Sequence, residues 1–385
     1  MNNGLCNAVS AAVGGVLDPE LRRPLAELGM IRDVEVSGST ARIGIALTIS
    51  TCPAVDRIER DIRLAAGSVA GIEEVRIDVG VMTEQERLTL TAKLREGRSQ
   101  TTTPFTADSL TRVIAVTSGK GGVGKSTVTA NLAVSMAERG LRVGVVDADV
   151  HGFSIPGLLG LIDADGDTRR PTRIEDLVLP PVAYGVKAVS IGMFLPEGTR
   201  HAVVSWRGPM LHRTLEQFLT DVFFGDLDVL LIDMPPGTGD IGISVGQILP
   251  HAEVIVVTTP QPTASGVAVR SALLARKFGQ RIIGVVETMA PMEVAGSTGF
   301  APFGSGGGAA VAAQLSADGD ETVPLLASIP FSIGLRAAAD AGVPVSAASP
   351  GDPAAVAFSS LAERLSIRSR GLAGHKLPIS LSQRV

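Results

Sequence analysis

Between residues 113 and 127 an apolar run leads into a glycine-rich loop that ends in a lysine and two hydroxyl residues. The β-branched residues at its start predict a buried strand, and Ser126 lies where a helix would begin. Without Cβ atoms the loop amides can converge on an anion, and a helix N-terminus adds its positive dipole end. Lys125 adds a full charge, and the Ser126 hydroxyl can ligand a magnesium ion that bridges phosphates. The chemistry expected here is therefore phosphate binding.

Two nucleotide-binding patterns fit this stretch. Three of its glycines satisfy G-x-G-x-x-G, and Asp147 lies at about the distance where a dinucleotide-binding fold places its ribose carboxylate. The Lys125-Ser126 pair satisfies the rarer pattern G-x-x-x-x-G-K-[ST], so we predict a P-loop and not a dinucleotide site or a purely structural glycine turn. The residues expected to bind nucleotide are Gly119, Lys120, Gly121, Gly122, Val123, Gly124, Lys125, Ser126 and Thr127.

Three carboxylates follow predicted buried strands. Asp147 and Asp149 come after the run 143–146, and Asp233 follows the run 227–232. Because ligands gather at the carboxyl ends of the strands of a parallel sheet, these side chains are expected near the phosphates. Asp233 has the position of a Walker B acid, and Gly237 in the next loop is expected to sense a γ-phosphate. The predicted magnesium site consists of Ser126, Asp147, Asp149 and Asp233.

The rest of the chain supplies the elements that must hold this site. Further buried runs at 254–257, 281–286 and 325–329 alternate with helical stretches, which predicts an α/β domain with a mostly parallel sheet flanked by helices over residues 109–368. Residues 1–95 contain short alternating strands and predict a small α+β domain. Residues 96–108 are rich in polar residues and predict a flexible linker, and residues 369–385 predict a tail.

Length and composition set further bounds. The 385 residues suffice for two domains, and 45% apolar with 3% aromatic residues predicts an aliphatic core. The net charge of −5 gives no electrostatic footprint for nucleic acid. No apolar run reaches the roughly 18 residues of a membrane span. The segment from Leu5 to Leu17 has no basic residue before it, so we expect an amphipathic helix of a cytoplasmic protein.

The two cysteines of the chain are Cys6 and Cys52. They cannot form a disulfide scaffold or a Cys-x-x-Cys pair. Cys52 falls between a predicted strand and a predicted helix, and a helix N-terminus can favour the reactive thiolate. The alternative is a small apolar residue packed at a turn. Position alone leaves both interpretations open.

Two stretches resemble known families. Asp18-Pro-Glu-Leu, Leu28-Gly-Met, Leu47-Thr-Ile and Cys52-Pro53 resemble the signature of the MIP18-like iron-sulfur assembly domain, which implies that Cys52 is the reactive position. The run Gly119-Lys-Gly-Gly-Val-Gly-Lys-Ser126 resembles the deviant Walker A motif of the MinD, ParA, ArsA and nitrogenase iron protein class. That resemblance implies that Lys120 crosses a homodimer interface to the partner's nucleotide.

Within this class the chain is most similar to the Mrp/ApbC iron-sulfur cluster carrier ATPases. The blocks that carry the resemblance are Asp147-Ala-Asp-Val-His-Gly-Phe-Ser-Ile-Pro156, Trp206-Arg-Gly-Pro-Met210, Asp233-Met-Pro-Pro-Gly-Thr-Gly-Asp240 and Thr258-Thr-Pro-Gln261. The resemblance implies a dimeric enzyme that hydrolyses ATP with Mg²⁺ and transfers iron-sulfur clusters to apoproteins. It also implies catalytic roles for Lys120, Lys125 and Asp149, the last as the residue that positions the attacking water.

One departure from this family leaves alternatives open. Relatives carry Cys-x-x-Cys in the loop after the strand that ends at Val286, whereas residues 287–304 contain no cysteine, and Thr288 replaces an asparagine that faces the base. A [4Fe-4S] cluster ordinarily takes four thiolates. An ATP-dependent adaptor that holds no cluster is therefore a second hypothesis. A third is a positioning switch like MinD or ParA, which would need a membrane-seeking helix or a basic DNA-binding face.

Overall fold

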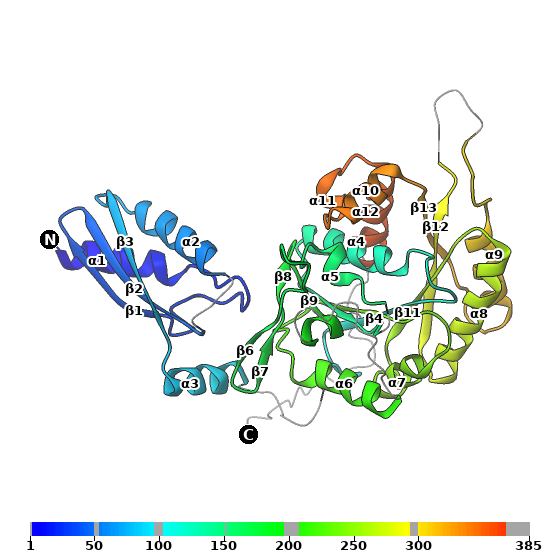
Figure 1. Ribbon diagram of the computed structural model, residues 1–385, viewed down its shortest axis with the longest axis horizontal. Coiled ribbons are helices and arrows are strands. Elements are labelled where there is room, and N and C mark those ends of the chain that lie inside the picture. Colours follow the sequence, from blue (N-terminus) through cyan, green and yellow to red (C-terminus); the bar gives the residue numbers. More distant parts are fainter. Residues whose placement is uncertain are drawn as a thin grey trace, which may run out of the picture.

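The computed structural model describes residues 2–49, 54–95, 103–150, 152–195, 208–292 and 299–366. The chain forms a small unit around a three-stranded sheet and a large unit around an eight-stranded sheet (Figure 1). Cys52, the linker residues 96–102 and the predicted tail 369–385 lie outside the described residues. The predicted α/β class, with a mostly parallel sheet after a small α+β unit, is confirmed.

The small unit packs two helices on its sheet. Strands β1 and β2 form an antiparallel hairpin, and β3 runs parallel to β2. Ile43 and Ile45 are two residues apart in β2 and so lie on one face of the strand, and Ile58 and Ile62 are four residues apart on one face of α2. All four side chains are buried together in the core of this unit. The elements are α1 (Asn2–Gly14), β1 (Ile31–Ser37), β2 (Thr40–Leu47), α2 (Val55–Gly67), β3 (Glu74–Val81) and α3 (Glu84–Arg95).

The large sheet has the strand order β13-β12-β11-β4-β10-β5-β9-β8, and only β8 runs antiparallel to its neighbour. Six of these strands match the predicted apolar runs. The strand β9 was not predicted, because Lys187 at its second position interrupts the apolar run. The strands of this unit are β4 (Arg112–Ser118), β5 (Val143–Asp147), β6 (Thr172–Ile174), β7 (Leu177–Leu179), β8 (Val182–Ala183), β9 (Val186–Ser190), β10 (Val229–Asp233), β11 (Glu253–Thr258), β12 (Arg281–Ala290) and β13 (Leu325–Pro330).

Helices cover both faces of this sheet and bury its aliphatic residues in two layers. One layer packs under α4 and α12, and the other packs under α6, α7, α8 and α9 (Figure 1). The helical elements are α4 (Lys125–Glu138), α5 (Ile155–Leu158), η1 (Ile191–Phe194), α6 (Gly208–Thr220), α7 (Asp240–Ile248), α8 (Pro262–Lys277), α9 (Gly307–Ala317), α10 (Ile333–Asp340), α11 (Val345–Ala348) and α12 (Pro353–Ser366).

A two-stranded hairpin, β6–β7, joins the two units. Its residues Ile174, Leu177 and Leu179 are buried in the same hydrophobic cluster as the core of the small unit. Helix α3, which was not predicted, completes the contact through Leu90 and Leu94. Ion pairs flank the apolar contact: Arg87 lies 3.0 Å from Glu175, and Arg95 lies 2.6 Å from Asp176. The hairpin, which belongs to the large unit, is therefore buried in the core of the small unit.

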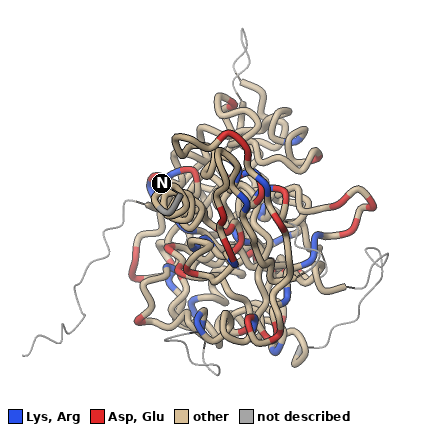
Figure 2. Tube along the Cα trace, turned by 90° about the vertical axis from the view of Figure 1, so that its left-hand side faces the viewer, with Lys and Arg blue, Asp and Glu red and all other residues tan. Residues whose placement is uncertain are grey.

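Charge is mixed on the side of the molecule that carries the small unit. Figure 2 shows basic and acidic positions interspersed there, and several of them pair, as Arg42 does with Asp78 at 2.5 Å and Arg76 with Glu74 at 2.9 Å. Among the residues that the structure describes, no helix is both long and apolar enough to cross a membrane.

Candidate nucleotide-binding site

The glycine-rich loop connects the carboxyl end of β4 to the first residue of α4, Lys125. Gly124 has a φ of +83°, a backbone conformation that favours glycine. Gly119 lies directly under α8, where an added Cβ would approach the Ala268 amide nitrogen to 2.3 Å. Both glycines are thus required by backbone geometry, one by its conformation and the other by the close approach of a helix.

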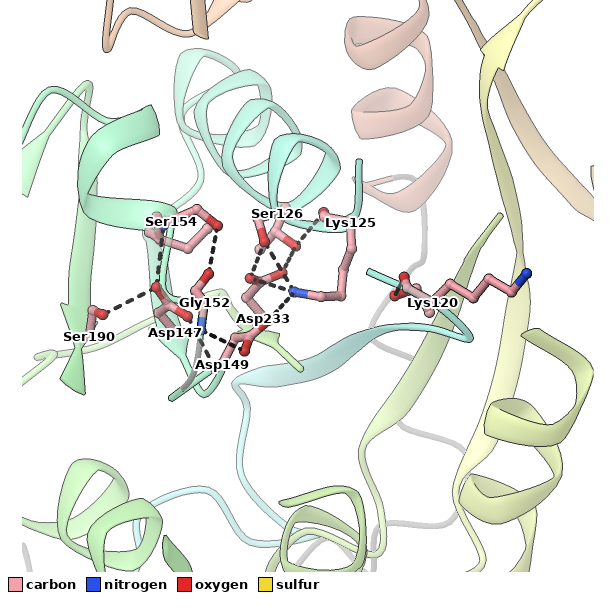
Figure 3. Close-up of polar contacts among 12 residues, drawn as sticks. Lys120, Lys125, Ser126, Asp147, Asp149, Gly152, Ser154, Ser190 and Asp233 are labelled. Atoms are coloured by element: carbon pink, nitrogen blue, oxygen red, sulfur yellow. Dashed lines mark hydrogen bonds and ion pairs between the residues drawn. The ribbon is translucent and has the colours of Figure 1, made fainter. Parts of the chain in front are cut away.

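Lys125 is buried and forms an ion pair with Asp233. The Lys125 Nζ lies 2.7 Å from Asp233 Oδ2 and 3.8 Å from Asp149 Oδ2 (Figure 3). The Ser126 hydroxyl donates to the same Asp233 oxygen at 2.6 Å. An isolated buried charge would be strongly unfavourable, so lysine and carboxylate stabilise one another at the end of the loop.

Asp233 is fully buried, and its second oxygen, Oδ1, accepts a hydrogen bond from the Thr129 hydroxyl at 2.8 Å. The sequence analysis did not select Thr129. Its position four residues after Lys125 places both side chains on one face of α4, which is the signal that identifies it. The carboxylate of Asp233 is therefore held by a lysine and two hydroxyls.

Asp147 and Asp149 lie beside Asp233, because β5 pairs in parallel with β10 and Asp147 stands opposite Asp233. Asp147 accepts from the Asp149 and Ile155 amides at 3.2 and 3.3 Å and from the Ser190 hydroxyl at 3.1 Å. Burial, followed by the charge of Asp233, raises the pKa of Asp147 well above its usual range. Its hydrogen bonds fix the segment between Asp149 and α5, so Asp147 shapes the loop that carries Asp149.

The donor set suits a magnesium ion held jointly with phosphates. No group of three or more His, Cys, Asp or Glu side chains in the described part of the chain is arranged to hold a metal by itself. Ser126 Oγ and Asp233 Oδ2, 2.6 Å apart, supply one hydroxyl and one carboxylate. Mg²⁺ usually keeps several waters and takes one or two protein carboxylates plus phosphate oxygens. These two residues fit that chemistry, whereas Asp147 has its oxygens directed at backbone amides and Ser190.

The predicted γ-phosphate sensor, Gly237, contacts the end of β4, and the second lysine, Lys120, lies in the glycine loop. Gly237 adopts a φ of +87° and donates its amide to the Ser118 carbonyl at 2.8 Å. Lys120 is exposed, and its side chain extends away from Lys125 and the carboxylates (Figure 3). The structure therefore brings Lys125, Ser126, Asp149 and Asp233 together and leaves Lys120 outside this group.

A pocket of about 230 Å³ adjoins the glycine loop. Thr288 lines it, and its hydroxyl donates to the Val123 carbonyl of the loop at 2.6 Å. Met289 follows with a φ of +51°, a strained conformation for a side chain of this size. The pocket is also lined by Gly124, Thr127, Pro330, Phe331 and Arg336. The pocket is mostly apolar, a lining that suits the flat face of a nucleotide base.

The two cysteines are not brought to this site by anything that the structure describes. Cys6 is half-buried in α1 and donates its thiol to the Val34 carbonyl at 3.1 Å, within the small unit. Cys52 lies outside the described residues, so its predicted reactivity stays a prediction.

Comparison with known proteins agrees with this geometry. Residues 109–366 match the family model described as NUBPL iron-transfer P-loop NTPase, and residues 7–79 match that described as iron-sulfur cluster assembly protein. The chain is 48% identical to the iron-sulfur cluster carrier protein of Mycobacterium tuberculosis, over 98% of this chain and 97% of the relative. It is 39% identical to the protein of the same name from Deinococcus radiodurans, over 98% of this chain and 100% of the relative.

A solved structure is similar as well. The nucleotide-binding protein of Archaeoglobus fulgidus, in complex with ADP, shares 33% identity at a TM-score of 0.50, over 60% of this chain and 86% of its own. The family match covers the whole large unit, with its glycine loop and the Lys125–Asp233 pair, and it leaves no need for the dinucleotide alternative. The chain belongs to the iron-transfer P-loop NTPase family, whose curated relatives are named iron-sulfur cluster carrier proteins.

Proposed function

We propose that this protein hydrolyses ATP with Mg²⁺ in the cytoplasm, as a homodimer, and assembles iron-sulfur clusters or carries them to apoproteins. Residues 109–368 would form the ATPase domain and residues 1–95 the assembly domain. One observation carries the proposal. A phosphate loop whose lysine and serine meet the Walker B carboxylate, Asp233, occurs in a chain that matches named carriers over 98% of its length.

A nucleotide that binds the loop must displace Asp233 from its ion pair with Lys125. Lys125 pairs with Asp233 at 2.7 Å, and the phosphates of ATP offer the lysine a stronger anionic partner. The freed Asp233 would then hold a metal-bound water while Ser126 ligands the Mg²⁺ itself. Mg²⁺ supplies charge neutralisation of the phosphates when bound. The loop amides and Lys125 orient the γ-phosphoryl group.

Asp149 and Lys120 complete the proposed catalytic set. Asp149 accepts from the Gly152 amide at 3.2 Å through Oδ1, and its Oδ2 lies 3.8 Å from Lys125 Nζ. When the phosphates draw Lys125 away, Asp149 would orient a water for in-line attack. Lys120 is exposed and points away from Lys125 and the carboxylates of its own chain, an orientation that supports a role toward a phosphate held by a second chain. Phosphoryl transfer needs mainly positioning and charge stabilisation, which these residues provide.

Mixing two inactive variants tests the shared site. Lys120→Ala keeps the Asp149 of its own chain, and Asp149→Ala keeps its Lys120. A mixed dimer therefore contains one complete site, and random pairing in a twofold dimer would restore about a quarter of the wild-type ATPase rate. No recovery on mixing, with dimers present by light scattering, would contradict a role for Lys120 across the interface.

The proposed cargo is an iron-sulfur cluster, and the chain has only two cysteines, Cys6 and Cys52, whose thiols could bind it. Cys6 donates to a backbone carbonyl inside the small unit, so Cys52 is the remaining cysteine of the chain. This observation favours a second candidate function: an ATP-dependent adaptor that recruits assembly partners while the cluster stays on them. Both candidates use the same nucleotide site.

Iron and sulfide analysis of protein purified without oxygen separates the two. A carrier contains both elements and loses them in Cys52→Ala, whereas the matched variant Cys6→Ala keeps them. Protein without iron or sulfide, with apoprotein maturation that still requires ATP, would establish the adaptor. Maturation that proceeds equally without this protein would refute both functions.

A further inference from the structure

Both peptide groups of Gly237 are held by neighbouring elements. The Gly237 amide donates to the carbonyl of Ser118, the last residue of β4, at 2.8 Å. The Gly237 carbonyl accepts from the hydroxyl of Ser271 in α8 at 3.1 Å. An amide aimed at a carbonyl at this distance has no second proton to offer, so it must turn before it can donate to a phosphate.

Ser271 is itself oriented by a second hydroxyl. Its Oγ lies 2.8 Å from the Oγ1 of Thr117, and both side chains are buried. Each hydroxyl has one proton to donate. Because Ser271 donates to Gly237, the proton between the two hydroxyls comes from Thr117. The chain of hydrogen bonds therefore runs in one direction, from Thr117 through Ser271 to Gly237.

The helix that carries Ser271 is fixed against the glycine loop. Gly119 approaches α8 so closely that an added Cβ would lie 2.3 Å from the backbone of Val267 and Ala268. Thr117 and Ser118 stand at the end of β4, which leads directly into Gly119. The partners of Gly237 therefore belong to one packed frame, and any movement of Gly237 away from that frame must lengthen its hydrogen bonds to Ser118 and Ser271.

We propose that Ser271, oriented by Thr117, is a positioning residue that holds Gly237 away from the γ-phosphate, so that ATP must displace this latch to engage the sensor. The proposal rests on the proposed function, because it assumes that Gly237 binds the γ-phosphate of a hydrolysed nucleotide. ADP has no γ-phosphate and leaves the latch closed. Ser271 thus sets how strongly the protein distinguishes ATP from ADP.

The test compares Ser271→Ala with Ser265→Ala in the full-length protein. Ser265 lies on the same helix but contacts the Gln261 and Gly307 carbonyls instead of Gly237. Calorimetry with Mg²⁺ measures the affinities for ADP and for a non-hydrolysable ATP analogue. We expect Ser271→Ala to bind the analogue about threefold to tenfold more tightly, with unchanged ADP affinity, as loss of one net hydrogen bond implies. Ser265→Ala should change neither affinity.

An unchanged or lower ratio of analogue to ADP affinity in a folded Ser271→Ala protein would overturn the role of Ser271 and leave the proposed function intact. Wild-type protein that binds neither nucleotide would refute both. Thr117→Val keeps the side-chain shape and removes only the orienting hydroxyl. Thr117→Val should raise the ratio of analogue to ADP affinity by a smaller factor than Ser271→Ala does. Thr117→Ser, which retains a hydroxyl, should keep the wild-type ratio. If Ser271→Ala does not fold, this second pair decides: equal ratios in Thr117→Val and wild type would overturn the proposal.

Discussion

Two buried clusters, each with one lysine among acidic side chains, lie in different parts of this molecule. At the nucleotide site Lys125 meets Asp233 directly at 2.7 Å, at the carboxyl ends of the strands. Where the small unit contacts the sheet, Asp18 accepts from the Glu20 and Leu21 amides at 2.9 and 2.7 Å. Glu20 accepts from Thr172. Burial raises the pKa of both acids, and the positive charge of Lys187 offsets part of that rise.

The difference lies in what completes each cluster. The first contains an ion pair that phosphates and Mg²⁺ can exchange, and its acids are held by hydroxyls and loop amides. The second is closed by the turn at Asp18 and by Thr172 of β6 and Lys187 of β9. Burial, and then the neighbouring Asp18, raises the pKa of Glu20 to about 7. The partners of a buried charge thus distinguish a ligand-binding site from a contact between units. At the first, the partner is an ion pair that a ligand can replace, and at the second the partners are residues of the other unit.

The largest expected effect is that of Lys125→Ala. It leaves Asp233 buried without a cation and removes a phosphate ligand, so ATPase activity should fall by at least about 10²-fold. The free energy of unfolding without nucleotide should fall by about 3 kcal/mol. Urea unfolding and phosphate release measure the two losses. Lys120→Ala is the matched control for stability, since its exposed side chain leaves no buried charge behind. Equal stability of Lys125→Ala and wild type would contradict the buried ion pair.

Asp149→Asn should separate binding from hydrolysis. The amide keeps the shape of the side chain and loses the charge that would orient a water, so the rate should fall about 10²-fold while ATP affinity changes by less than about tenfold. Single-turnover kinetics and calorimetry measure these quantities. Hydrolysis at the wild-type rate in this variant would exclude Asp149 as the water-positioning residue.

Glu20→Gln tests the second cluster through pH. The pKa of Glu20 is raised on folding, so its contribution to stability is fully present below about pH 4.5 and is lost as pH rises through about 7. The free energy of unfolding of the variant, which cannot ionise, should exceed that of wild type by about 3 kcal/mol at pH 8 and match it near pH 4. Denaturant titrations at both pH values measure this difference, with the exposed Glu35→Gln as control. A difference independent of pH would show that Glu20 does not titrate in this range.

The smallest effect is expected at the rim of the same contact. Arg95 pairs with Asp176, whose side chain is mostly exposed. Arg95→Ala should therefore cost at most about 1 kcal/mol, and less at high salt. A double-mutant cycle with Asp176→Ala isolates the pair, and a coupling energy well above this value would place the pair in the buried part of the contact.

The nucleotide site was largely predictable because its signal is local. Glycine spacing and acids that follow apolar runs indicate both the motif and the sheet edge at which Lys125, Ser126 and Asp233 meet. Residues that act through tertiary contacts carried no such signal: Ser190 reaches Asp147 from an unpredicted strand, and Ser271 is one small residue in an ordinary helix. The domain contact was missed for the same reason, since the three-residue strands β6 and β7 are too short to show a period.

Because β6 and β7 are buried in the core of the small unit, the two units should not be separable into independently folding domains. A tethered domain can be cut away and studied alone, but here removal of residues 1–95 would expose Ile174, Leu177 and Leu179 to water. The two units should therefore melt in a single calorimetric transition, and either fragment expressed separately should aggregate. Evolution and engineering can replace the small unit only together with the hairpin that receives it.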